Sequence, residues 1–248
     1  MYSEFAYVYD ELTKDIDYLK LADYLEELML EYAKMKPKLV LDLACGTGSL
    51  TVQFAKRGYD MIGIDISADM LNCALERSTE LEKSPLWVCQ DMRSFELYGT
   101  VDAILCATDS LNYITDYNDL KSVFRLVKNY LNPGGIFIFD MNTPYKIEKI
   151  LGNNVFYEVH DDIAYIWQNY YNTDTRIATF DLTFFIKQSE QLYKKIEEEQ
   201  CQKAWSLDEI KSALDESGLR LLNTYENLTK DPPSDTTQRY VYIAALAE

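Results

Sequence analysis

Apolar positions in the first 150 residues switch repeatedly between helical and strand-like patterns. From Asp15 to Lys36 apolar side chains recur at nearly helical spacing, which predicts an amphipathic helix that Pro37 stops. Five short apolar runs follow, separated by segments of helical character, at residues 39–43, 61–64, 86–89, 101–106 and 136–139. Such runs are typical of strands buried on both faces, and their alternation with helices predicts a parallel sheet.

The pattern changes to period two between about residues 154 and 201, where Tyr, Thr, Phe and Ile are abundant. This alternation predicts three or four antiparallel strands. A helix should follow, because Ser206 and Glu209 have the spacing of a capping box and Gly218 suits the position after a helix end. Two further strands are expected near residues 219–225 and 239–246.

These elements predict an α/β fold with a Rossmann-like, doubly wound sheet of seven strands and a small antiparallel β insertion. The expected domains are residues 1–152 with 202–248, whose N-terminal part would be a helical lid, and the insertion at 153–201. Right-handed crossovers would bring the loops after the parallel strands to one edge of the sheet. Ligand chemistry is therefore expected at that edge, with the insertion as a lid over it.

Composition narrows the classes of partner. The chain of 248 residues has a net charge of −17, which argues against nucleic acid, because binding phosphates needs clustered Lys and Arg. Five cysteines without a C-x-x-C pair indicate reduced, intracellular thiols, and the single histidine, His160, leaves a structural zinc site without ligands. Neither a signal peptide nor a membrane-spanning run is expected, so the predicted location is cytoplasmic.

The strongest motif runs from Asp42 through Ala44, Gly46 and Gly48, where an apolar strand enters a glycine turn and then a helix. A dinucleotide-binding loop would have a third glycine where Thr51 stands, and a pyrophosphate would be repelled by Asp42. S-adenosylmethionine has a sulfonium and an ammonium but no phosphate, so a carboxylate suits it. The alternative is a tight turn whose glycines are purely steric.

Two more carboxylates follow the next two strands. Asp65, followed by Ile66, stands where a carboxylate can accept hydrogen bonds from both ribose hydroxyls. Asp91 could accept from the adenine amino group while Met92 packs on the ring. Each acid has a simpler explanation as a helix cap or a solvated loop residue. Together with Asp42 they would form a row of carboxylates, and desolvating such a row is costly unless it binds donors.

These motifs resemble those of the class I S-adenosylmethionine-dependent methyltransferases at residues 42–48, 63–67, 90–92 and 131–135. The segment 5–12 and the β-rich insertion are similar to a bacterial subgroup of small-molecule methyltransferases with a layout like that of glycine N-methyltransferase. The resemblance covers most of the chain and implies that the last strand, 239–246, is antiparallel.

The resemblance also implies roles for individual residues. Asp65 would bind the ribose, with Ile66 beside it in the cofactor site, and Asp91 and Met92 would bind the adenine. The backbone around Ala44 and Gly46 would hold the methionine part, with Asp42 and Gly48 completing the set. Cys106, at the end of the fourth strand, would lie near the sulfonium.

The acceptor side is less defined. Asp109, after the fourth strand, is the first candidate for orienting or deprotonating an acceptor, and a turn cap is its alternative role. Tyr9 is expected to fold over the cofactor as part of a lid and to take part in catalysis; it could instead only pack on the first helix. His160 is interpreted as a surface residue. Weaker candidates in the insertion are Trp167, Tyr170 and Arg176.

The function predicted from sequence is methyl transfer from S-adenosylmethionine to a small-molecule acceptor by in-line displacement. This chemistry depends mainly on alignment, so the absence of an obvious catalytic histidine or cysteine does not oppose it. Two alternatives remain at this point: an NAD-dependent oxidoreductase, and a protein that binds S-adenosylmethionine without turnover. Membrane partners and a bound metal are not expected, and a homodimer is one option for assembly.

Overall fold

Alternating strands and helices build the larger part of the protein. The computed structural model describes residues 8–10, 13–190 and 192–247. Its helices are α2 (Tyr18–Tyr32), α3 (Ser49–Lys56), α4 (Ala68–Arg77), α5 (Tyr117–Tyr130) and α6 (Leu207–Glu216), with two short helices, η1 (Ser110–Tyr113) and η2 (Lys146–Leu151). The strands are β1 (Leu39–Leu43), β2 (Asp60–Asp65), β3 (Leu86–Cys89), β4 (Val101–Cys106), β5 (Leu131–Asn142), β6 (Val155–Val159), β7 (Ile163–Asn172), β8 (Ile177–Ser189), β9 (Leu192–Lys203), β10 (Leu219–Glu226) and β11 (Arg239–Leu246).

Seven strands form one sheet in the order β10-β11-β5-β4-β1-β2-β3. The pairs from β3 to β5 are parallel, and β11 runs antiparallel between β5 and β10. The predicted fold class and the antiparallel last strand are thus confirmed. Because β1 and β4 are neighbours that are not consecutive in the chain, the direction of winding changes between them. In sheets of this kind ligands bind at the carboxyl ends of the strands beside such a point.

The fifth strand is longer than the hydrophobic pattern predicts. It begins at Leu131, directly after α5, and its pairing with β4 shifts where Leu131 faces Val101 and Ile136 faces Ala103. Pro133 and Gly134, residue types more common in turns, therefore lie in a bulge inside the strand. Gly134 has a φ of +82°, which glycine adopts without steric cost.

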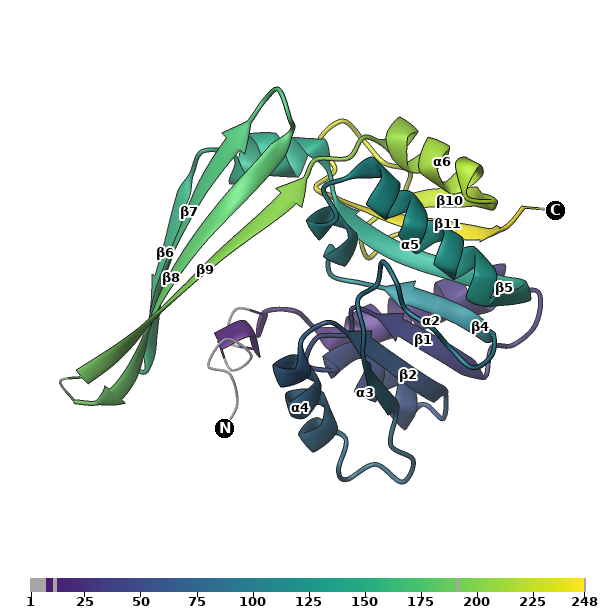
Figure 1. The fold of residues 1–248 in the computed structure, drawn as a ribbon, viewed down its shortest axis with the longest axis horizontal. Coiled ribbons are helices and arrows are strands. Elements are labelled where there is room, and N and C mark those ends of the chain that lie inside the picture. Colours follow the sequence, from purple (N-terminus) through teal and green to yellow (C-terminus); the bar gives the residue numbers. More distant parts are fainter. Residues whose placement is uncertain (1–7, 11–12, 191, 248) are drawn as a thin grey trace.

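Helices cover both faces of the sheet, as Figure 1 shows. Alternate residues of β1 divide the core: Leu41 and Leu43 pack toward α5 and α6, whereas Val40 packs toward α2 and α3. Serine side chains cap two of the helices, and the one at Ser206 is the cap expected from the sequence. Ser67 caps α4, and Ser206 forms a complete capping box with Glu209 at the start of α6.

Strands β6 to β9 form a separate antiparallel sheet that projects from the larger domain on the left of Figure 1. The predicted antiparallel insertion is confirmed as four strands. Its inner face packs against η2 and against Val8 from the N-terminal segment. These contacts form a third hydrophobic core, besides the two on the faces of the larger sheet. Its buried apolar residues on β7 and β8 are Ile163, Ala178, Phe180, Leu182 and Phe184.

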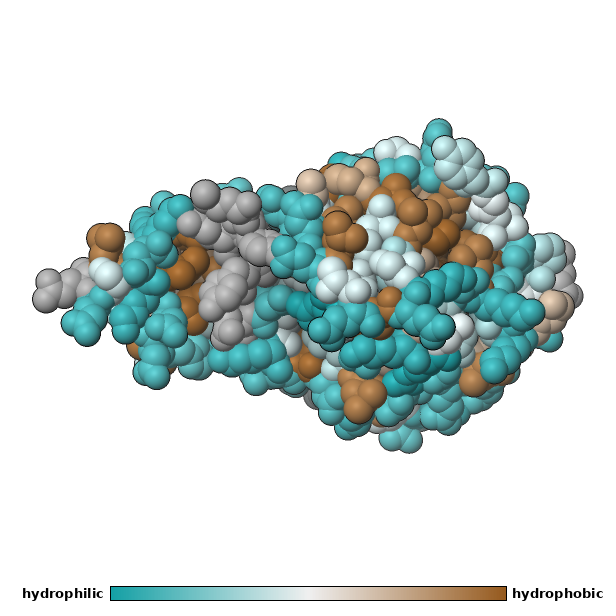
Figure 2. All heavy atoms as spheres, turned by 90° about the horizontal axis from the view of Figure 1, so that it is seen from below, coloured by the Kyte–Doolittle hydropathy of each residue, from teal (hydrophilic) through white to brown (hydrophobic). Residues whose placement is uncertain are grey.

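The surface is mostly hydrophilic on the face that Figure 2 shows. Hydrophobic side chains gather in separate places on that face, over both the larger part of the protein and the projecting sheet. Among the described residues, no helix is both long and apolar enough to cross a membrane.

Candidate functional site

The glycine turn between β1 and α3 contains three residues with positive φ: Ala44 at +62°, Gly46 at +54° and Gly48 at +75°. A left-handed alanine is strained, and such strain gathers at functional sites. The two glycines differ in role. A Cβ on Gly48 would lie 2.6 Å from the Trp87 ring, so this glycine is needed for packing. A Cβ on Gly46 would meet only a ring carbon of Tyr9, at 3.8 Å, so space lies open above it.

Asp42 is a buried carboxylate beneath this turn, with 2% of its surface exposed. It accepts a hydrogen bond of 2.5 Å from the hydroxyl of Thr51, the residue that stands in place of a third glycine. Burial raises the pKa of Asp42 to about 6, and nearby Asp65 adds to the rise, against the lowering effect of the Thr51 hydrogen bond. The position thus favours a cationic neighbour.

Asp65 ends β2 and ties the glycine turn to the neighbouring strand. Its carboxylate accepts hydrogen bonds from the backbone N–H of Gly46 at 2.8 Å and of Ser67 at 2.9 Å. Burial raises the pKa of Asp65, and these backbone donors oppose the rise. The next residue, Ile66, is 66% exposed. An exposed apolar side chain beside a polar strand end can pack against a ligand.

Asp91 lies just after β3 and already has a partner. The guanidinium of Arg93 binds it through Nε at 3.0 Å and through Nη2 at 2.5 Å, which holds the pKa of Asp91 below its usual range. Met92 is partly buried against the core. Because β1, β2 and β3 are adjacent, the three carboxylates lie at one edge of the sheet, and each already accepts at least one hydrogen bond.

The end of β4 has a buried thiol, and two residues with strained backbone follow it. Cys106 ends β4 fully buried, and burial raises the pKa of its thiol well above the ordinary value. Thr108 and Asp109 have φ values of +59° and +55°, in the left-handed region that side chains other than glycine rarely adopt. The Asp140 carboxylate holds both, accepting from the N–H of Thr108 at 2.8 Å and of Asp109 at 2.7 Å.

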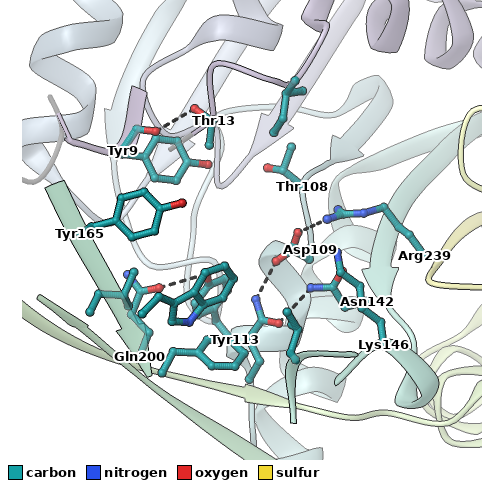
Figure 3. A pocket seen from close by; sticks show the side chains of 16 residues that line it. Tyr9, Thr13, Thr108, Asp109, Tyr113, Asn142, Lys146, Tyr165, Gln200 and Arg239 are labelled. Carbon is teal, nitrogen blue, oxygen red and sulfur yellow. Dashed lines mark hydrogen bonds and ion pairs between the residues drawn. The ribbon is translucent and has the colours of Figure 1, made fainter. Parts of the chain in front are cut away.

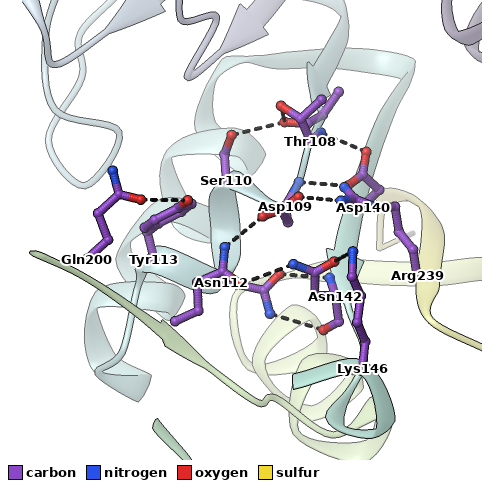
Figure 4. A network of polar contacts seen from close by, with 12 residues as sticks. Thr108, Asp109, Ser110, Asn112, Tyr113, Asp140, Asn142, Lys146, Gln200 and Arg239 are labelled. Carbon is purple, nitrogen blue, oxygen red and sulfur yellow. Dashed lines mark hydrogen bonds and ion pairs between the residues drawn. The ribbon is translucent and has the colours of Figure 1, made fainter. Parts of the chain in front are cut away.

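A buried charge cluster surrounds this strained pair. The guanidinium of Arg239, on β11, bridges the carboxylates of Asp109 and Asp140. Gln202, on β9, donates a hydrogen bond of 2.6 Å to the other oxygen of Asp109. Figure 4 shows the resulting network, which joins β4, β5 and β11 to the insertion. Both oxygens of Asp109 are engaged, so the side chain fixes its surroundings.

A cavity of about 250 Å³ lies between this network and the insertion. Figure 3 shows Tyr9 and Tyr165 on one side of it and Asp109, Asn142 and Arg239 on the other. Its full lining comprises Tyr9, Thr13, Ile16, Thr108, Asp109, Tyr113, Asn142, Lys146, Leu151, Tyr165, Trp167, Phe180, Leu182, Gln200, Gln202 and Arg239.

A smaller cavity of about 20 Å³ lies beside the glycine turn and is lined in part by Asp42, Ala44 and Cys45. Tyr9 and Thr108 line both spaces. Burial raises the pKa of the Tyr9 hydroxyl strongly, so this residue is a neutral phenol. It therefore stands at the boundary between the glycine turn and the larger cavity.

The segment that holds Tyr9 is fastened across the turn. Asp10 accepts a hydrogen bond of 2.7 Å from the Thr47 hydroxyl and pairs with Arg77 at 2.6 Å. Arg77 also donates to the Ser49 hydroxyl at 2.5 Å. Residues 8–10 thus connect the glycine turn, the start of α3 and the end of α4.

The structure separates the sequence candidates of the insertion. Trp167 lines the larger cavity, whereas Tyr170 and Arg176 do not; Arg176 pairs with Glu209 of α6. His160 is exposed and contacts Glu158 at 2.9 Å. The polar residues of the site that sequence reasoning missed are Asp140, Asn142, Lys146, Gln202 and Arg239. Of these, Asp140 alone had a visible signal, because it is an acid directly after the fifth apolar run.

Comparisons with known proteins agree with this geometry. A family model described as a methyltransferase domain matches residues 40–135. YqeM of Bacillus subtilis (strain 168), provisionally named as a methyltransferase, is 31% identical over 98% of this chain and 96% of its own. A solved S-adenosylmethionine-dependent methyltransferase from Clostridium acetobutylicum ATCC 824 is 34% identical, with a TM-score of 0.89 over 99% of this chain and 98% of that one.

A third relative matches less of the chain. The glycine/sarcosine N-methyltransferase of Halorhodospira halochloris is 30% identical over 44% of this chain and 42% of its own length.

Proposed function

Because this chain belongs to the class I S-adenosylmethionine-dependent methyltransferases, we propose that it binds S-adenosylmethionine at the glycine turn and transfers the methyl group to a small molecule in the larger cavity. The observation that carries this proposal is the meeting of the two cavities at Tyr9 and Thr108. A methyl group must pass directly between the cofactor site and the acceptor site, and two cavities that share lining residues support such a transfer. Family membership also favours this function over the NAD-dependent alternative.

The residues at the turn fit the cofactor. The buried Asp42 carboxylate, with its raised pKa, is stabilised by the positive charge of the methionine part, and the open space above Gly46 admits backbone contact. Asp65 keeps free acceptor capacity for ribose hydroxyls beyond its two backbone donors, and exposed Ile66 is an apolar surface beside it. S-adenosylmethionine supplies the transferable methyl group.

Asp91 fits a narrower role than the sequence suggests. Arg93 already binds both of its oxygens, so hydrogen bonds to adenine would use the remaining lone pairs. We expect Met92 to pack on the ring and Asp91 to orient it. Cys106 would lie beneath the sulfonium as a neutral, buried side chain.

Alignment would provide most of the catalysis. Well-oriented intramolecular reactions gain about 7–11 kcal/mol from positioning alone. The neutral phenol of Tyr9 would close the space between acceptor and cofactor and keep water out. Asp109, with both oxygens engaged, would fix Gln202 and Arg239 in the wall of the acceptor cavity. Its alternative role, deprotonating the acceptor, would require one of these bonds to open.

The insertion at 153–201 would act as the acceptor lid above the domain formed by 1–152 and 202–248. Its inner face supplies the aromatic wall of the larger cavity, with Tyr165, Trp167 and Phe180. The named relative from Halorhodospira methylates glycine and sarcosine, which supports a small amine as the acceptor class.

Calorimetric titration with S-adenosylmethionine, S-adenosylhomocysteine and NAD tests the cofactor half of the proposal. Binding of the first two, in the micromolar range or about −8 kcal/mol, with no binding of NAD, is the expected result. Binding of NAD alone, or of none of the three, would overturn it. Turnover is then tested by the release of S-adenosylhomocysteine with a panel of small amines. A protein that binds the cofactor but methylates no member of a broad panel would support the non-catalytic alternative.

A further inference from the structure

Lys146 is a cation in the wall of the acceptor cavity. It stands at the start of η2 and donates a hydrogen bond of 2.9 Å to Oδ1 of Asn142. Burial lowers the pKa of Lys146, the charge of Arg239 lowers it further, and Asp109 and Asp140 oppose this. Within the described part of the chain, Lys146 forms no ion pair. An ammonium has three N–H donors, and Asn142 accepts one.

The hydrogen bonds that start at Lys146 all point the same way, from donor to acceptor, and end at Asp109. Asn142 receives from Lys146 and donates through Nδ2 to Oε1 of Gln202 at 3.0 Å, and Gln202 donates in turn to Asp109. Asp109 and Asp140 are also bridged by Arg239. Figure 4 shows Lys146 at one end of this series of hydrogen bonds. Each side-chain oxygen along it therefore already accepts a hydrogen bond, whereas the ammonium retains donors.

The cavity lining includes a second donor, on β7. The indole N–H of Trp167 is buried and has no hydrogen-bond partner among the described residues. An unsatisfied buried donor is costly, and such groups call for an explanation. Gln200, the remaining amide of the lining near Tyr113, already accepts from the Tyr113 hydroxyl at 3.2 Å. The ammonium of Lys146 and the indole of Trp167 thus both offer N–H donors to a ligand in the cavity.

We propose that the methyl acceptor carries an anionic oxygen group, a carboxylate or a phosphate, that binds the ammonium of Lys146, while its apolar part packs against Trp167 and Phe180. This assignment rests on the proposed function, because it names the substrate class of the same cavity. Lys146 binds and positions the acceptor, and the methyl-accepting atom lies toward Tyr9. The neutral charge balance of Asp109, Asp140, Arg239 and Lys146 explains how the cation is kept buried before the acceptor arrives.

Ligand-detected NMR with small probes tests the site without knowledge of the acceptor. Acetate and inorganic phosphate are the anionic probes, and acetamide is the neutral match for acetate. The wild-type protein should bind at least one anion and bind acetamide more weakly, and the preferred anion distinguishes a carboxylate from a phosphate group. Lys146→Met should weaken anion binding about tenfold or more, as expected for a charge-assisted hydrogen bond. Lys146→Arg, which keeps the charge, should retain it within a few-fold.

Lys149→Met is the matched control, because Lys149 lies on the same short helix but is exposed and pairs with Glu148. It should leave anion binding unchanged. The proposal is overturned if Lys146→Met binds the anions as the wild type does, if the wild type binds neither, or if acetamide binds as well as the preferred anion. Each variant is also titrated with S-adenosylmethionine. If the wild type does not bind S-adenosylmethionine, the proposed function is wrong. The anion titration, run with and without cofactor, tests the role of Lys146 separately.

Discussion

The carboxylate of Asp140 accepts a hydrogen bond of 2.7 Å from the backbone N–H of Asp109, a residue with a φ of +55°. A second bond from Thr108 and the guanidinium of Arg239 complete its surroundings, and Asp140 is only 3% exposed. The left-handed pair after β4 is therefore maintained by one buried carboxylate. Strained backbone persists only where the surrounding structure holds it.

Asp140→Ala should destabilise the fold by about 3 kcal/mol, because it leaves Arg239 buried with one partner fewer and frees two backbone donors. Denaturant unfolding measures this. Asp116→Ala provides the scale: Asp116 caps α5 at the surface, and losing a cap costs about 1 kcal/mol. Equal losses in the two variants would mean that the 108–109 loop is not held by Asp140.

Asp65→Ala should weaken S-adenosylmethionine binding by about 2 kcal/mol, or roughly 30-fold, through lost ribose contacts and a looser glycine turn. Calorimetry gives the affinity directly. Asp60→Ala is the control, because Asp60 begins the same strand at its opposite end and pairs with Lys83 at the surface. Unchanged affinity in Asp65→Ala would remove this residue from the cofactor site.

Most of the fold could be predicted from the chain, because burial on both faces leaves a continuous apolar run wherever a central strand lies. Strand β1 matched its predicted bounds, and the glycine turn and the cap at Ser206 followed from local chemistry. The predicted start of β5, at residue 136, was wrong, because a bulge lets Pro133 and Gly134 lie within the strand.

The acceptor cavity was less predictable for a physical reason. Lys146 and Arg239 are far apart in sequence and come together because β5 pairs with β11, and Gln202 joins them because β9 returns to this edge of the sheet. Local pattern carries no information about such a meeting. By contrast, Asp42 and Asp65 follow directly from strand ends, which is why the cofactor side could be outlined from sequence and the network around Asp109 could not.

The buried carboxylate of Asp42 predicts a pH dependence. Its folded-state pKa, about 6, lies above the ordinary value of 3.8, so its contribution to stability is present below about pH 4 and is lost as the pH rises through 6. Without cofactor, Asp42→Asn should therefore be more stable than the wild type at pH 7 by up to about 3 kcal/mol, and equally stable near pH 4. Unfolding curves at both pH values measure the difference.

Cofactor binding should respond in the opposite sense. The wild type should lose affinity for S-adenosylmethionine as the pH falls below about 6, since protonation removes the charge that faces the cation. Asp42→Asn should bind weakly at every pH, without this step. A wild-type affinity that is flat between pH 5 and 8 would show that the Asp42 charge does not contribute.

Removal of residues 154–201, with a short linker, should leave cofactor binding intact and abolish acceptor methylation. Trp167→Ala is the milder form of the same test, because it opens the cavity wall and keeps the sheet. Tyr170→Ala is its control, since Tyr170 lies on the same strand, is 49% exposed and does not line the cavity. Methylation retained by the deleted protein would contradict the assignment of the insertion as an acceptor lid.

The ion pair of Asp10 with Arg77 should control how fast the cofactor enters and leaves. Both side chains are about one-third exposed, so breaking the pair costs at most about 1 kcal/mol, which corresponds to roughly a fivefold change in rate. Arg77→Met and Asp10→Asn should each accelerate S-adenosylmethionine dissociation by that factor in stopped-flow measurements. The double variant should be no faster than either single one, because both changes remove the same contact.

Lys83→Met, which breaks a surface pair away from residues 8–10, should have the wild-type rate. Unaltered dissociation in Arg77→Met would mean that the segment carrying Tyr9 does not cover the bound cofactor.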